Sequence, residues 1–196
     1  MLSIENISKI MIAKVTNGNV IDIPIEACNL WKDKPAIIYV VRRPGWALCR
    51  YDAFELSSRF GDKSSKDCVA NLYAIIKNRS EKLDLEGLAA FQSRYFNDNA
   101  VYIDLNNEFY NAFGNKSLLS QSLRSWNPFV LFSDMKAVGA RLTEKKIEGN
   151  YKGEGLIKGG LFIITPDNNI VYHHYEKTGS TIPYEEIENV LASLSK

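Results

Sequence analysis

Hydrophobic and polar positions along the chain predict buried strands that alternate with amphipathic helices. Three runs are apolar throughout, as is typical of strands buried on both faces of a sheet. These runs are residues 35–41, 72–76 and 100–103. Apolar residues at helical spacing fill the two intervals, over 47–60 with Gly61 as a cap and over 85–96. The first half of the chain therefore contains a predicted βαβαβ unit.

A hairpin is predicted ahead of this unit. Its strands, over 10–15 and 20–25, flank Asn17-Gly18, a pair suited to a tight primed turn. A short helix over 26–31 is expected to connect the hairpin to the first buried strand.

The second half of the chain predicts a helix, another hairpin and a last helix. Asn127-Pro128 is a good helix start, because Asn caps the first turn and Pro is tolerated there, and apolar spacing continues to Leu142. Two strands, over 161–164 and 170–175, then precede an amphipathic helix over 184–194. Residues 109–126 fit no element clearly.

The order of these elements indicates the fold class. It predicts an α/β protein with the thioredoxin-like arrangement, a three-layer sandwich with a central mixed sheet and an N-terminal β-hairpin. No internal repeat or low-complexity linker divides the 196 residues, so one domain over 1–196 is expected. The strand over 35–41 is expected at the centre of the sheet, with a site at its carboxyl end.

Composition and charge restrict the classes of partner. Hydrophobic residues make up 45% of the chain, enough for a sizeable core, and the formal net charge is +1 with acids and bases interspersed. We therefore expect neither a nucleic-acid partner nor a membrane partner. No window approaches the ~20 uninterrupted apolar residues of a membrane span, and the amino terminus lacks the pattern of a signal peptide. A cytoplasmic location is expected.

Cysteine, histidine and glycine positions exclude several site types. Three cysteines at scattered spacings are no disulfide framework and fit a reducing compartment. No pair stands at metal-ligand spacing, and His173-His174 are neighbours on a strand, so they point to opposite faces. We therefore expect no metal and no cofactor. Gly159-Gly160 are expected to permit a close backbone approach beside the site.

The informative segment runs Arg42-Arg43-Pro44-Gly45-Trp46-Ala47-Leu48-Cys49-Arg50, where the buried strand gives way to a helix. A thiol in the first helical turn lies among unpaired N–H groups at the positive end of the helix dipole. With the flanking arginines, such surroundings lower a cysteine pKa into the range of about 3.5–7.5, which favours a reactive thiolate. The alternative is that Cys49 is a small buried hydrophobe on the inner face of the helix.

Several blocks in this order resemble the peroxiredoxin-like 2 family, which includes selenoprotein U members and belongs to the thioredoxin-like superfamily. The hallmark of that family is Arg-Arg-Pro-Gly-Cys-x-x-Cys-Arg after a buried strand. The matching blocks are Arg42 to Arg50, Asn29 to Trp31, Val101 to Asp104, Phe109-Tyr110, Gly149 to Gly155, Gly159-Gly160, and His174 with Glu176. The resemblance implies a thioredoxin-like fold and a thiol oxidoreductase or redox regulator; some members are described as prostaglandin F synthases.

The chain departs from that pattern at its centre, because Trp46 stands where the family has its first cysteine or selenocysteine. An indole forms no disulfide, so a two-cysteine cycle within the motif is excluded. Cys49 then corresponds either to a buried resolving cysteine or to the reactive position of a one-cysteine peroxiredoxin. Cys68 is a candidate to resolve an oxidised Cys49, and it is also a candidate core residue.

Two hypotheses about function remain open. In the first, the chain is a peroxiredoxin-like thiol oxidoreductase or antioxidant protein, with Cys49 as its redox residue and an external thiol reductant. Its substrate would be a peroxide or a small apolar molecule. In the second, it is a catalytically degenerate module that binds an apolar ligand or protein partner. The binding residues of the site would be Arg42, Arg43, Pro44, Gly45, Trp46, Gly159 and Gly160.

Overall fold

The computed structural model describes residues 4–16, 19–20, 23–62, 68–77, 85–112, 143, 145, 147–149, 159–176 and 181–195. The strands are β1 (Met11–Thr16), β2 (Asn19–Val20), β3 (Ile25–Glu26), β4 (Ala36–Val40), β5 (Asn71–Lys77), β6 (Ala100–Asp104), β7 (Gly160–Ile164) and β8 (Ile170–Tyr175). The α-helices are α1 (Ile4–Ser8), α2 (Ala47–Phe60), α3 (Leu85–Ala90), α4 (Glu108–Ala112) and α7 (Tyr184–Leu194). A 3₁₀ turn, η1 (Ala27–Leu30), precedes β4, and a π-helical turn, η2 (Phe91–Tyr95), extends α3.

All the described strands belong to one mixed sheet. Its order is β2-β1-β6-β5-β4-β7-β8, and β3 pairs with β1 beside this path. Strands β4, β5 and β6 run parallel to one another, whereas β1, β7 and β8 pair antiparallel with their neighbours. Strand β4 lies between β5 and β7, as predicted for the apolar run over 35–41. All five β4 residues are buried, which explains why that run shows no polar alternation.

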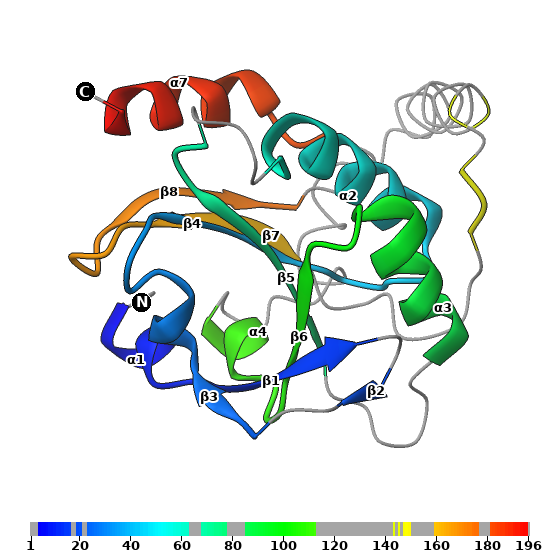
Figure 1. Cartoon of the computed structure of the whole chain (residues 1–196), viewed down its shortest axis with the longest axis horizontal. Coiled ribbons are helices and arrows are strands. Elements are labelled where there is room, and N and C mark those ends of the chain that lie inside the picture. The colour runs from blue at the N-terminus through cyan, green and yellow to red at the C-terminus, as the bar shows by residue number, and fades with distance from the viewer. Residues whose placement is uncertain are drawn as a thin grey trace, which may run out of the picture.

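Helices cover both faces of the sheet and form three layers (Figure 1). On one face, α2, α3 and α7 pack on a core that includes Leu56, Phe91 and Ile187. On the other face, α1, η1 and α4 enclose a second core around Ile7, Trp31 and Phe109. The predicted three-layer α/β sandwich is therefore confirmed. No helix in the described ranges is long and apolar enough to cross a membrane.

The elements agree with the sequence-based expectations except near the amino end and at α4, which overlaps the start of the stretch over 109–126 that fitted no element. Helix α1 was not predicted; its five residues bury only the side chain of Ile7, which is too little for a periodic pattern. The second strand of the predicted hairpin is split into β2 and β3, which both pair with β1. The expected Asn17-Gly18 turn and the helix from Asn127 to Leu142 lie outside the described residues, and one domain over 1–196 stays a prediction.

Two buried side chains hold the carboxyl edge of the sheet together. The Tyr110 hydroxyl lies 2.6 Å from the carbonyl oxygen of Val41 and 3.2 Å from that of Ile75, so it bridges the ends of β4 and β5. The Asp104 carboxylate accepts the backbone N–H groups of Glu108 and Phe109, at 3.0 and 2.8 Å, and thereby caps α4. These bonds order the edge from which the motif segment begins.

Candidate functional site

The motif segment forms the turn between β4 and α2, as predicted. The Trp46 N–H donates to the carbonyl of Arg43 at 3.1 Å and closes the turn. Trp46 has an extended backbone and is the N-cap residue, and its carbonyl accepts the first helical bond, from Arg50 N–H at 3.0 Å. The indole makes no capping bond. Cys49 therefore lies in the first turn of a 14-residue helix.

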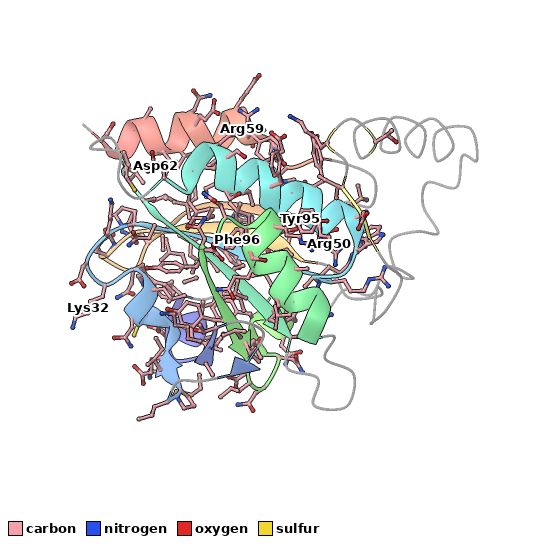
Figure 2. The ribbon with its side chains drawn as sticks, turned by 45° about the vertical axis from the view of Figure 1, so that its right-hand side comes forward. Lys32, Arg50, Arg59, Asp62, Tyr95 and Phe96 are labelled. Atoms are coloured by element: carbon pink, nitrogen blue, oxygen red, sulfur yellow. The ribbon has the colours of Figure 1, made fainter. Side chains whose placement is uncertain are left out.

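Arg50 ties this turn to a distant part of the chain. Its Nε donates to the carbonyl of Pro44 at 3.0 Å, and its Nη1 donates to the carbonyl of Glu148 at 2.6 Å. The guanidinium also lies 5.0 Å from the ring centroid of Tyr95, and Figure 2 shows both residues beside the start of α2. A Cβ on Gly149 would lie 2.5 Å from the backbone nitrogen of Ala47. Residues 147–149 therefore pack directly against the helix start.

Arg42 is the charged centre of the site. Its side chain is 2% exposed, and its guanidinium lies 3.5 Å from the ring centroid of Trp46, a cation–π contact. The guanidinium of Arg43 lies 5.5 Å from the same ring. An ion pair joins Arg42 Nη2 to Glu176 Oε1 at 3.4 Å, while Arg42 Nε has no hydrogen-bond partner among the described residues. The half-buried indole is thus held beside two cations.

Gly159 and Gly160 bring the β7–β8 hairpin close to the motif, as expected for these glycines. Gly160 is the register partner of Val40, and a Cβ on Gly159 would lie 2.2 Å from the Val40 carbonyl oxygen. Only glycine is compatible with that approach. The Gly159 N–H donates to Glu176 Oε2 at 3.1 Å, and the Glu176 N–H donates to the Gly159 carbonyl at 3.2 Å.

Cys49 differs from the expected reactive thiolate. The residue is fully buried, and the pKa of its thiol is raised from 9.0 to about 12. Burial is the main cause and the Glu176 carboxylate is the second, whereas Arg42 and the Arg43 backbone N–H act in the opposite direction. The prediction of a lowered pKa is therefore wrong for this conformation. The cost of burying a thiolate exceeds the stabilisation that the helix start and the arginines supply.

The other two cysteines lie away from this cluster. Cys68 lies just before the start of β5 and donates to the carbonyl of Ala70 at 3.3 Å. Cys49 comes after the end of β4, which runs parallel to β5, so the two cysteines lie at opposite ends of this strand pair. Five paired residues span four rises of about 3.3 Å, which separates these ends by roughly 13 Å. A disulfide needs Cα atoms within about 7 Å, so the structure does not bring Cys68 to Cys49. Cys28 is half-buried before β4 and donates to Glu26 at 3.6 Å.

The structure brings together the motif residues, Arg50 included, and Gly159-Gly160, and it adds Glu176, which was not predicted for the site. Glu176 had a sequence signal, since it belongs to one of the matching family blocks, but its charge partner was not foreseeable.

His173 is exposed and stacks edge-to-face on Tyr175 at 5.3 Å. Within the described part of the chain, no group of His, Cys, Asp and Glu residues could hold a metal ion.

Fold and site together define a thioredoxin-like α/β protein with one buried cysteine in the first turn after its central strand. Solved structures share this fold: Enterococcus faecalis AhpC has a TM-score of 0.56 at 12% identity, covering 93% of this chain and 86% of that one. A secreted Mycobacterium tuberculosis disulfide oxidoreductase homologous to DsbE has a TM-score of 0.54 at 12% identity, covering 96% and 98%.

The sequence comparisons identify the family. The model of the AhpC/TSA antioxidant enzyme family matches residues 56–178, so the chain belongs to that family of peroxiredoxin-like redox proteins. The matched range begins after Cys49. Prostamide/prostaglandin F synthase of Salmo salar is 28% identical over 169 residues, covering 85% of this chain and 79% of that protein. Peroxiredoxin-like 2A of Xenopus tropicalis is 35% identical over 156 residues, covering 78% of this chain and 60% of that protein.

Proposed function

We propose that this chain is a redox-family protein that binds an apolar ligand or protein partner at Trp46 and turns over no peroxide at Cys49. The observation that carries the proposal is that, at the start of α2, the thiol is buried and the indole is partly accessible. The only motif thiol, at Cys49, is fully buried with a pKa of about 12, while the position before the helix holds a half-buried indole.

Trp46 has the properties of a binding residue. Tryptophan is enriched at binding hot spots, and a side chain that is already ordered loses little entropy when a partner binds. Arg42 lies on the ring at 3.5 Å and is itself fixed by Glu176, so the indole is held in place. Arg43, at 5.5 Å, adds a second cation beside the indole. A ligand with an apolar body and an anionic group is the chemistry that this arrangement fits.

The test uses 8-anilinonaphthalene-1-sulfonate, an apolar anionic dye, as the probe. We expect one saturable site on the native protein, with affinity lowered at least ~10-fold by Trp46→Ala, a loss of about 1.4 kcal/mol. Ile23→Ala is the control, because Ile23 is an apolar side chain that is 87% exposed and belongs to a different part of the chain. Equal dye binding by the parent protein and the Trp46 variant would contradict the proposal.

A one-cysteine oxidoreductase is the second candidate, and a specific contact favours it. The backbone N–H of Arg43 hydrogen-bonds the Cys49 sulfur, and the Arg42 charge also favours the thiolate. The first proposal, in which Cys49 is unreactive, predicts the opposite. Iodoacetamide should then label Cys49 only when the protein unfolds, at least ~1,000-fold more slowly than it labels unfolded protein. Mass spectrometry with site assignment at neutral pH measures this, and the half-buried Cys28 and Cys68 are internal controls. Rapid labelling of native Cys49, with consumption of hydrogen peroxide, would establish the second candidate.

A further inference from the structure

One carboxylate joins three separate segments around Cys49. Glu176 follows β8, and its Oε1 pairs with Arg42 in the motif at 3.4 Å. Its Oε2 accepts the N–H of Gly159, before β7, at 3.1 Å. The Glu176 side chain is 15% exposed, so both interactions are largely shielded from water. The carboxylate is therefore held in one position, with each oxygen engaged.

The ion pair with Glu176 reduces the extent to which Arg42 can stabilise the Cys49 thiolate. A cation near a thiol favours the thiolate, and the lone motif cysteine of this chain lies within range of the Arg42 charge. The guanidinium, however, is held between the Trp46 ring and the Glu176 carboxylate. The carboxylate balances the positive charge and adds a negative charge to the surroundings of the sulfur. Both effects favour the neutral thiol.

We propose that Glu176 is a positioning residue that adds to burial in favouring the thiol form of Cys49, by holding Arg42 in a neutral pair against Trp46. The proposal deepens the proposed function, because it names a charged group that helps to keep the motif thiol silent, and it can fail independently of binding at Trp46. No covalent step is involved. The role is electrostatic, and it depends on the ion pair and the Gly159 bond described above.

Other groups that influence Cys49 do not supply the same effect. Among the described residues, the charged and titratable side chains that act on it are Arg42, Glu176, Asp52, Tyr39 and Tyr110. Burial raises the pKa of both tyrosines well above 10.0, so they stay neutral. Asp52, on the same helix, accepts a hydrogen bond from the Tyr184 hydroxyl at 3.2 Å and raises the Cys49 pKa less than Glu176 does. Glu176 is thus the strongest influence after burial itself.

The test is Glu176→Gln, which keeps the side-chain shape and removes the charge. With ¹³Cβ-labelled cysteine, the Cys49 chemical shift is followed against pH, and Cys49→Ser assigns its signal. We expect the midpoint of the Cys49 titration to be at least ~1 pH unit lower in Glu176→Gln than in the parent protein. At a pH well below both midpoints, this corresponds to a tenfold larger thiolate fraction. The Cys28 and Cys68 signals should not move, and far-UV circular dichroism should remain native.

Two further variants separate charge from packing. Glu186→Gln makes the same charge change on α7, where Glu186 accepts a bond from the Tyr172 hydroxyl at 2.9 Å, and it should leave the Cys49 midpoint unchanged. Glu176→Asp keeps the charge and should retain most of the parent midpoint. If Glu176→Gln unfolds before its titration is complete, the two proteins are compared over the pH range in which circular dichroism remains native, where the onset of the Cys49 shift should come ~1 pH unit earlier in the variant. An unchanged onset or midpoint, or an equal shift in Glu186→Gln, overturns the proposal. Dye binding is compared between the parent protein and Trp46→Ala, in which Glu176 is unchanged, so it tests the proposed function separately.

Discussion

Replacement of Trp46 by cysteine is expected to create a disulfide with Cys49 and a dithiol redox cycle that the parent chain lacks. Residue 46 is the N-cap and Cys49 lies in the first turn of α2. Residues three apart at a helix start fall within the Cα separation of about 4.4–6.8 Å that a disulfide needs. The introduced thiol would also lie beside Arg42, which favours its thiolate.

The measurement is mass spectrometry after mild oxidation, which should show the loss of two hydrogens from the peptide that contains both residues. The oxidised variant should then accept electrons from dithiothreitol, and the reduced variant should pass them to a peptide disulfide. Trp46→Ser is the matched control, because it removes the indole without supplying a thiol. A folded Trp46→Cys variant that forms no disulfide would mean that the site has been rebuilt around the indole.

Replacement of Arg42 by methionine is expected to lower the free energy of unfolding by about 3 kcal/mol, because it leaves the Glu176 charge unpaired in a mostly buried place. The Arg42 and Glu176 side chains are 2% and 15% exposed. The change also removes the cation that lies 3.5 Å from the Trp46 ring. Urea unfolding monitored by circular dichroism measures the loss.

Arg59 provides the matched control for this substitution. It also forms an ion pair, with Glu188 at 2.8 Å, but the two side chains are 41% and 48% exposed. Figure 2 shows Arg59 near the opposite end of α2 from Arg50. Arg59→Met should therefore cost less than about 1 kcal/mol. Equal losses at positions 42 and 59 would contradict the argument.

A double variant separates the unpaired charge from the lost packing of the arginine. Combining Arg42→Met with Glu176→Gln removes both charges of the pair, so no buried charge remains without a partner. This double variant should recover part of the stability that Arg42→Met alone loses. The same urea titration measures the recovery, and a double variant no more stable than Arg42→Met would assign the loss to packing instead.

The local pattern of the chain was sufficient to predict most of the elements and the place of the site. The run over 35–41 is apolar at every position because β4 is buried on both faces, and this marks it as central. Pro44-Gly45 end that strand, and helical spacing resumes at Ala47, so the motif could be placed at a helix start. Helix α1 escaped prediction because one buried side chain in five residues leaves no period.

The state of the thiol depended on distant residues and could not be read from the motif. The sequence by itself determined that one cysteine stands at the helix start among three arginines, with a tryptophan three residues before it. Only the tertiary structure decided that the sheet and α2 bury Cys49 completely, and that Glu176, far along the chain, pairs with Arg42. Helix position and neighbouring charge are local properties of a sequence. Desolvation and ion pairing depend on which segments the fold brings together, and here they decide the direction of the Cys49 pKa shift.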